Sequence, residues 1–259
     1  MAGSARFPIL PAVAVMFALT APALIVSAAS AADGAVGSRP SAAPSSIVIG
    51  FVGGFVRHDN PRHGPVLFAQ RIQRTCPKDA YVRVFENRHR KTAYSTILRL
   101  LDRNHDNILS DEEKAQARII LYGHSWGASA AVLLARELNR LGIPVLLTVQ
   151  VDSVRKLWQQ DRTIPENVAA AVNFYQPHGL LHGRPQITAA DPSRTQILGN
   201  YRFDYRETPV RCESNSWFNH LTPSHAQSEC DPHIWAQVED LVRQRLRPEP
   251  NAVAAIPEP

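Results

Sequence analysis

Short apolar runs alternate with segments of helical periodicity along most of the chain. Apolar or alternating runs predict strands, at residues 47–55, 81–85, 118–122, 145–151, 172–175 and 196–203, and those at 47–55 and 118–122 are expected to be buried. Apolar residues three and four positions apart predict helices, at residues 64–75, 92–101 and 128–141, with a last helix that begins at Asp231 and Pro232. Strands that alternate with helices pair in parallel, and the functional residues of such sheets follow the strands directly.

The two ends of the chain depart from this pattern. Residues 1–31 carry an early positive charge and a long apolar stretch that closes in small residues near Ala31, which is typical of a secretory signal peptide. Three prolines in the stretch argue against a membrane anchor. Residues 32–46 predict a flexible lead-in, and the proline-rich residues 248–259 predict a disordered tail. We therefore expect one domain at 47–247 that is secreted or periplasmic, with no transmembrane span in the mature chain.

The overall composition limits the class of protein further. A chain of 259 residues with 44% hydrophobic and 20% charged residues is that of a folded domain. The formal net charge is +5, but the basic residues are spread along the chain and form no dense stripe beside aromatic residues. Nucleic-acid binding is therefore not expected. The composition leaves the oligomeric state open.

The sharpest chemical signal is the run Gly123-His-Ser-Trp-Gly127. It lies between a predicted strand and a predicted alanine-rich helix. A G-x-S-x-G pattern predicts a nucleophile only in this strand–turn–helix context. The chain must reverse within one tight turn, so Ser125 stands at its tip with small residues on both sides. We expect the Ser125 hydroxyl to be a nucleophile and the Trp126 amide to bind an oxyanion.

With this motif and this order of elements, the sequence resembles the serine esterases and lipases of the α/β-hydrolase superfamily. The resemblance implies an α/β-hydrolase fold, with a mostly parallel central sheet and helices on both faces. It also implies the order nucleophile, acid, histidine. Asp152 directly follows the strand at 145–151 and is the first choice for the acid, with Asp191 as the alternative. For the base, His225 is the first choice and His220 is the alternative. Both are expected on a loop before the last helix.

These residues predict a secreted serine hydrolase that cleaves carboxylic esters, lipid-like esters among them, through an acyl-enzyme. The second oxyanion donor is expected after the first strand, from Gly54 or Phe55. Catalysis would require no cofactor. The alternative is a non-catalytic protein with this fold that binds a partner or is stabilised by calcium. A thioesterase or acyltransferase would use the same residues, because the reaction class depends on the pocket.

A second motif, at residues 102–113, resembles an EF-hand calcium loop. Oxygen ligands fall at the required positions 1, 3, 5, 7, 9 and 12, which are Asp102, Asn104, Asp106, the Ile108 carbonyl, Ser110 and Glu113. Asn107 replaces the usual glycine at position 6, and asparagine tolerates the left-handed conformation. Ser110 and Glu113 also form a capping box, which explains those two residues without a metal. The sequence therefore predicts a structural calcium ion, while the capping box is an alternative explanation for Ser110 and Glu113.

The chain has three cysteines, at positions 76, 212 and 230. Cys212 and Cys230 lie on either side of His220 and His225, so a disulfide between them would close a loop of 18 residues around the expected base. A bond from Cys76 to either partner stays open, because the sequence alone does not determine the pairing.

Overall fold

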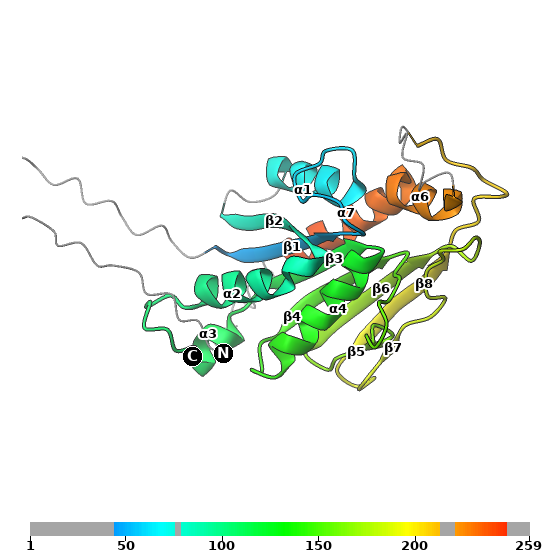
Figure 1. The fold of residues 1–259 in the computed structure, drawn as a ribbon. Coiled ribbons are helices and arrows are strands. Elements are labelled where there is room, and N and C mark those ends of the chain that lie inside the picture. The colour runs from blue at the N-terminus through cyan, green and yellow to red at the C-terminus, as the bar shows by residue number, and fades with distance from the viewer. Residues whose placement is uncertain (1–43, 76–78, 213–220, 248–259) are drawn as a thin grey trace, which may run out of the picture. The chain divides into compact units, whose positions relative to one another are not determined.

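The computed structural model describes residues 44–75, 79–212 and 221–247. The expected signal peptide, most of the lead-in and the C-terminal tail lie outside these residues, as do Cys76 and His220. The described residues form an α/β unit on a six-stranded sheet (Figure 1). None of the helices within these ranges has the length and apolar character of a membrane span.

The sheet is parallel at every pairing. Its strands are β1 (Ser46–Val52), β2 (Ala80–Glu86), β3 (Ile119–His124), β4 (Val145–Val151), β6 (Val168–Tyr175) and β8 (Gln196–Arg202), in the spatial order β2-β1-β3-β4-β6-β8. The short β5 (Thr163–Ile164) and β7 (Thr188–Ala189) pair with each other in a separate two-stranded sheet.

Helices cover both faces of the six-stranded sheet (Figure 1). The helices are α1 (Gly64–Thr75), the 3₁₀ helix η1 (Asn87–His89), α2 (Arg90–Leu101), α3 (Asp111–Ala115), α4 (Trp126–Asn139), α6 (Pro223–Cys230) and α7 (Pro232–Leu246). Apolar residues of α1 and α7 belong to one buried cluster, and those of α2 and α4 to another. The expected class, α/β with a mostly parallel central sheet and helices on both faces, is confirmed.

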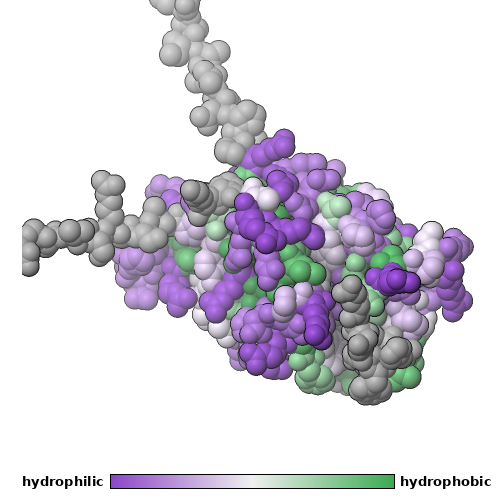
Figure 2. All heavy atoms as spheres, turned by 90° about the horizontal axis from the view of Figure 1, so that it is seen from above, coloured by the Kyte–Doolittle hydropathy of each residue, from purple (hydrophilic) through white to green (hydrophobic). Residues whose placement is uncertain are grey.

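The two clusters explain why the central strands read as unbroken apolar runs. In β1, Ile47, Ile49 and Phe51 belong to the cluster with α2 and α4, whereas Val48 and Val52 belong to the cluster with α1 and α7. Successive side chains of a strand point to opposite faces, so both sets are buried. The view onto α1 and α7 shows mainly hydrophilic side chains with small hydrophobic areas between them (Figure 2). The outer sides of these helices therefore meet solvent, and their inner sides complete the core.

Several elements differ from the sequence prediction. Helix α4 begins at Trp126 rather than at residue 128, because the turn after β3 enters the helix within one residue. Strand β6 begins at Val168 rather than at residue 172, because small alanines extend its pairing with β4. The loop expected around His225 is the helix α6, so that prediction was wrong. Pro223 at its first turn marks a helix start, but its mixed polar residues give no apolar periodicity.

The strand order reverses at one point, between the second and third strands of the sheet. The chain leaves β1 toward β2 on one side and later returns to β3 on the other, so the order reverses between β1 and β3. Ligands of open parallel sheets bind beyond the carboxyl ends of the strands at such a switch point. The residues after β1 and β3 are therefore the ones that the fold places at a site.

Helix α4 approaches β1 closely at this point. A Cβ atom on Gly127 would collide with the backbone carbonyl of Phe51, and one on Gly123 would collide with the backbone of Gly127. Both positions lie in the strand–serine–helix turn, where backbone rather than flexible side chain occupies the space. Glycine is therefore required on each side of Ser125 by packing alone.

We predict that Gly127→Ala lowers the free energy of unfolding by about 1–3 kcal/mol, because the added methyl group forces α4 away from β1. Urea denaturation followed by circular dichroism would measure the change. Arg140→Ala, at the exposed end of the same helix, is the control and should change stability by less than about 0.5 kcal/mol. Equal stability of Gly127→Ala and the wild type would contradict the close approach.

Candidate active site

The turn between β3 and α4 holds Ser125 in a strained backbone conformation. Its φ is 57° and its ψ is −126°, a region that residues other than glycine rarely adopt. The Ser125 amide donates to the Val151 carbonyl at 3.0 Å, which fixes the turn to the end of β4. The strain is thus balanced by the sheet, and the Ser125 side chain is directed out of the turn at the carboxyl edge.

The structure brings together the three residues that the sequence selects first. Ser125 Oγ lies 2.9 Å from His225 Nε2, and His225 Nδ1 lies 2.7 Å from Asp152 Oδ2. The residues are separated in sequence by 100 and 73 positions, and all three are buried. A carboxylate can only accept a hydrogen bond, so Nδ1 carries the proton and Nε2 accepts from the serine. This arrangement can remove the serine proton during nucleophilic attack.

The Asp152 carboxylate is fully buried, and four donors surround it. Besides His225 Nδ1, they are the Gln176 backbone amide at 3.1 Å, Gln176 Nε2 at 2.9 Å and Ser228 Oγ at 3.3 Å. A buried carboxylate is costly unless its oxygens are hydrogen-bonded, and this set supplies that compensation. Sequence reasoning missed Gln176, although its place directly after β6 was a signal available at the carboxyl edge.

The alternative acid and base stand apart from this geometry. Asp191 lies in a turn after β7, where it accepts hydrogen bonds from the amide and the hydroxyl of Ser193. These hydrogen bonds lower the pKa of Asp191. His220 lies outside the described residues. Among the described residues, Asp152 and His225 are therefore the acid and the imidazole that the fold places beside Ser125.

A second histidine, His124, lies against the ring of His225. The two ring centroids are 4.6 Å apart, and His124 Nε2 is 3.3 Å from Ser228 Oγ. Burial lowers the pKa of His124 to about 4, although Glu229 opposes part of that effect. His124 is therefore neutral near pH 7 and adds no positive charge beside the His225 ring. The sequence showed His124 only as part of the nucleophile motif.

Glu229 lies between His124 and His63, the residue directly before α1. Its carboxylate lies 2.8 Å from His63 Nδ1 and 3.6 Å from His124 Nδ1. Burial raises the pKa of Glu229, but His124 and His63 outweigh that effect, so the net shift is downward. Glu229 is therefore an anion beside His63 and His124.

The same side chains are near enough to hold a metal ion. Ligand atoms of His124, Asp152 and His225 all lie within 4.8 Å of one another. However, His225 Nδ1 and Asp152 Oδ2 already form a direct hydrogen bond with each other. This hydrogen bond accounts for the short distance between His225 and Asp152 without a metal ion.

The expected oxyanion donors lie on two sides of Ser125. Trp126 is the first residue of α4, where backbone amides have no partner within the helix. The turn after β1 packs against the serine so closely that a Cβ on Gly53 would be 2.8 Å from Ser125 Cβ. Gly54 has a φ of 47°, and its carbonyl accepts from Asn87 Nδ2 at 2.6 Å. Gly54 and Phe55 both belong to this turn and stay the two predicted sources of the second donor.

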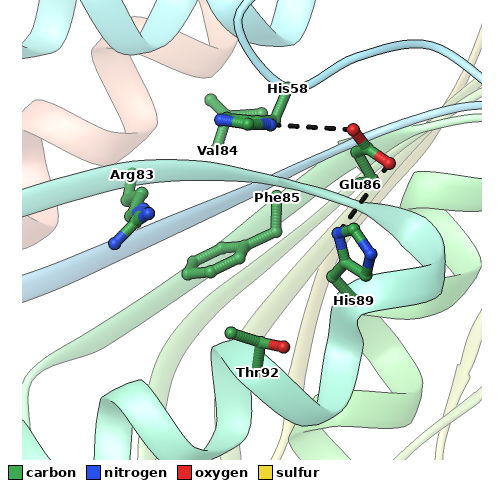
Figure 3. Close-up of a pocket in the computed structure, with 7 residues that line it drawn as sticks. All are labelled: His58, Arg83, Val84, Phe85, Glu86, His89 and Thr92. Atoms are coloured by element: carbon green, nitrogen blue, oxygen red, sulfur yellow. Dashed lines mark ion pairs between the residues drawn. The ribbon is translucent and has the colours of Figure 1, made fainter.

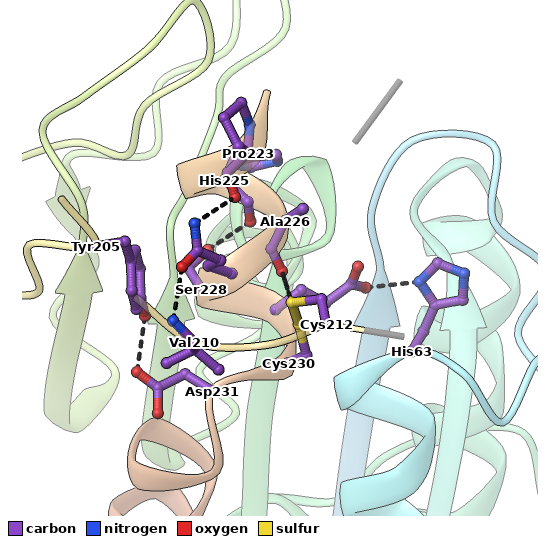
Figure 4. Close-up of a disulfide and its surroundings, with 12 residues drawn as sticks. His63, Tyr205, Val210, Cys212, Pro223, His225, Ala226, Ser228, Cys230 and Asp231 are labelled. Atoms are coloured by element: carbon purple, nitrogen blue, oxygen red, sulfur yellow. Dashed lines mark hydrogen bonds and ion pairs between the residues drawn. A yellow bond between two sulfur atoms is a disulfide. The ribbon is translucent and has the colours of Figure 1, made fainter. Parts of the chain in front are cut away.

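A disulfide ties the helix that carries His225 to the preceding segment. Cys212 and Cys230 are bonded, with their Cα atoms 5.9 Å apart, so the pairing favoured by their spacing is confirmed (Figure 4). The Val210 amide also donates to Gln227 Oε1 at 2.7 Å. The position of the His225 imidazole thus depends on a covalent link as well as on packing.

The loop at residues 102–113 lies between α2 and β3, at the amino end of that strand. Asn107 has a φ of 65°, the left-handed conformation expected at position 6. The Asp102 carboxylate accepts from the amides of Asp106 and Asn107. Ser110 and Glu113 form the full capping box, and hydrogen bonds from Ser110 and Arg103 lower the pKa of Glu113. Position 6 thus has the conformation expected of an EF-hand loop, and the calcium ion stays a prediction.

The comparisons with known proteins give only distant likenesses. No protein-family model and no curated protein matches the sequence. Among solved structures, RedJ with a PEG molecule bound in its active site has a TM-score of 0.37 at 10% identity, over 79% of this chain and 95% of RedJ. An acetylxylan esterase at 0.90 Å resolution has a TM-score of 0.39 at 9% identity, over 80% of this chain and 100% of that one. An iodinated complex of acetyl xylan esterase has a TM-score of 0.36 at 9% identity, over 79% and 99%. With TM-scores below 0.5, these likenesses do not define the function of the chain.

We predict that His124 makes the protein less stable in mild acid. The unfolded histidine takes up a proton near pH 6.5, whereas the folded one does so only near pH 4. Stability is therefore complete above pH 6.5 and is lost as the pH falls, by about 2 kcal/mol between pH 7 and pH 5. Urea denaturation of the wild type and of His124→Phe would measure this term, which the variant should lack. The same pH dependence in both proteins would exclude His124 as its source.

We predict that the loop at 102–113 binds calcium weakly, with a dissociation constant of about 10⁻⁴–10⁻³ M. Terbium luminescence and calorimetry would detect binding. Asp106→Asn should weaken it while leaving the capping box intact, and Asp111→Asn, at an exposed residue that is not an expected ligand, should not. Absence of heat and luminescence at millimolar concentrations would reject the site.

Proposed function

We propose that the protein is a serine hydrolase that cleaves carboxylic esters, with Ser125 as nucleophile, His225 as general base and acid, and Asp152 as the residue that orients the histidine. One observation carries this proposal: the continuous hydrogen-bonded series from Ser125 Oγ through the His225 ring to the buried Asp152 carboxylate. A chance serine in a glycine-flanked turn would not require an imidazole from a segment 100 residues away.

The mechanism follows from the roles of these atoms. As Ser125 Oγ attacks the acyl carbon, its proton passes to His225 Nε2, and the carbonyl oxygen gains a negative charge. The Trp126 amide and a second amide from the turn after β1 would bind that oxygen. The imidazolium is stabilised by Asp152, and it then gives its proton to the departing alcohol as the C–O bond breaks. Water repeats the sequence on the acyl-enzyme, so the acid is released and the serine regains its proton.

We further propose that the protein acts outside the cytoplasm. The Cys212–Cys230 disulfide supports this, because such bonds persist in oxidising compartments and are rare in the cytosol. The leader at residues 1–31 that led to the same expectation lies outside the described residues.

We predict that Ser125→Ala abolishes hydrolysis of 4-nitrophenyl esters and labelling by a fluorophosphonate probe, with a loss in kcat of about 10⁴-fold or more. Ser129→Ala, which removes a buried serine one turn further along α4, is the control and should retain labelling. Labelling of Ser125→Ala equal to that of the wild type would refute the assignment of the nucleophile.

The same assay separates the alternative residues. His225→Ala and Asp152→Asn should lose activity while the protein remains folded, whereas His220→Ala and Asp191→Asn should retain most of it. A folded wild-type protein that takes up no probe would favour the non-catalytic alternative. Loss of activity in His220→Ala with full activity in His225→Ala would reassign the base.

A further inference from the structure

Lys156 places a positive charge beside the residue that follows the nucleophile. It lies in the segment after β4, and its Nζ is 4.8 Å from the centre of the Trp126 ring. The same Nζ donates to Asn87 Oδ1 at 2.6 Å. A cation over an aromatic face is attracted by the negative electrostatic potential of the ring. The ammonium group is therefore held in place by two neutral groups.

Asn87 links this lysine to the turn expected to complete the oxyanion hole. Its side-chain amide donates to the Val52 carbonyl at 3.2 Å and to the Gly54 carbonyl at 2.6 Å. Gly54 belongs to the turn that packs against Ser125 through Gly53. Lys156 thus contacts Trp126, which follows Ser125, and is linked through Asn87 to the turn after β1.

The acidic residues near this position are already paired with arginines. Glu86 contacts Arg88, and Glu137 Oε1 is 3.0 Å from Arg90 Nη2. Glu86 also lies between His58 and His89 at the end of β2, in a small cavity that these side chains line (Figure 3). Within the described ranges, no carboxylate oxygen lies within 4.0 Å of Lys156 Nζ. Partial burial and the charges of Arg90 and Arg88 lower the pKa of Lys156.

Exposed apolar side chains surround the same place. Phe55 is 83% exposed, and its ring packs edge-on against Trp126 with centroids 5.6 Å apart. Leu157 and Trp158, which follow the lysine directly, are 85% and 98% exposed. Large apolar side chains that point into solvent beside a nucleophile indicate a surface that a ligand covers. The position therefore combines an apolar wall with a cation that lacks an anionic partner.

We propose that Lys156 binds a negatively charged group on the substrate, so that the enzyme prefers esters that carry both a hydrocarbon part and an anionic group such as a carboxylate or phosphate. This inference rests on the proposed ester hydrolysis. The hydrocarbon part lies against Phe55 and Trp126, and the anion supplies the charge that the protein itself does not place beside Lys156. Lys156 is then a residue that determines specificity, while the chemistry stays with Ser125 and His225.

Paired substrates test this proposal. One pair places the charge in the acyl part, 4-nitrophenyl hexanoate against the half-ester of adipic acid with 4-nitrophenol. A second pair places it in the alcohol part, phenyl hexanoate against 4-carboxyphenyl hexanoate. In at least one pair, Lys156→Met should lower kcat/KM for the anionic ester by about tenfold and leave the neutral ester within about twofold. Lys156→Glu should lower it further, and Lys156→Arg should retain the preference.

Control variants distinguish recognition from general effects. Lys91→Met removes an exposed lysine from α2 and should change neither substrate. Equal loss for the neutral and the anionic ester in Lys156→Met would show that the lysine only supports the turn through Asn87, and it would overturn the proposal. Equal kcat/KM for the neutral and the anionic ester in both pairs, measured on the wild type, would overturn it too. Fluorophosphonate labelling of Ser125 in each variant keeps these outcomes separate from a failure of the proposed function.

Discussion

The tight passage from β3 into α4 is the constraint on which the site depends. It forces a non-glycine residue to a φ of 57°, and it brings the helix backbone against the end of β1. A strained residue persists only where its surroundings determine its conformation, and here the ends of β1 and β4 do so. The rest of the architecture supplies a rigid edge on which one hydroxyl can be held toward an imidazole.

Two carboxylates lie at different distances from that hydroxyl. Asp152 contacts the imidazole of His225 directly, and Glu229 lies behind the neutral ring of His124. Two carboxylates thus lie near the His225 ring, which would carry a positive charge in the proposed reaction. Burial would make each of them costly in isolation, and the hydrogen bonds from Gln176, Ser228 and His63 offset that cost.

Much of the fold and of the first candidate site could be predicted because strong local patterns carried them. The apolar runs identified all six strands of the main sheet, and the glycines around Ser125 marked the turn. Asp152 could be chosen because it directly follows a predicted strand. Sequence reasoning failed where tertiary contacts decide. Helix α6 has no apolar periodicity, Gln176 matters only through its distance to Asp152, and His124 becomes notable only once its ring lies on that of His225.

The order of the segments along the chain has a consequence for the nascent protein. The nucleophile turn is made from β1, β3 and α4, all of which precede residue 140, whereas the imidazole arrives with α6 near the end. Until α6 has docked, the Ser125 hydroxyl lacks its hydrogen bond to His225. The bond between Cys212 and Cys230 anchors that helix. Ser125 and His225 can therefore meet only once the chain has been made through α6, so a shorter nascent chain holds the serine in its turn without the imidazole.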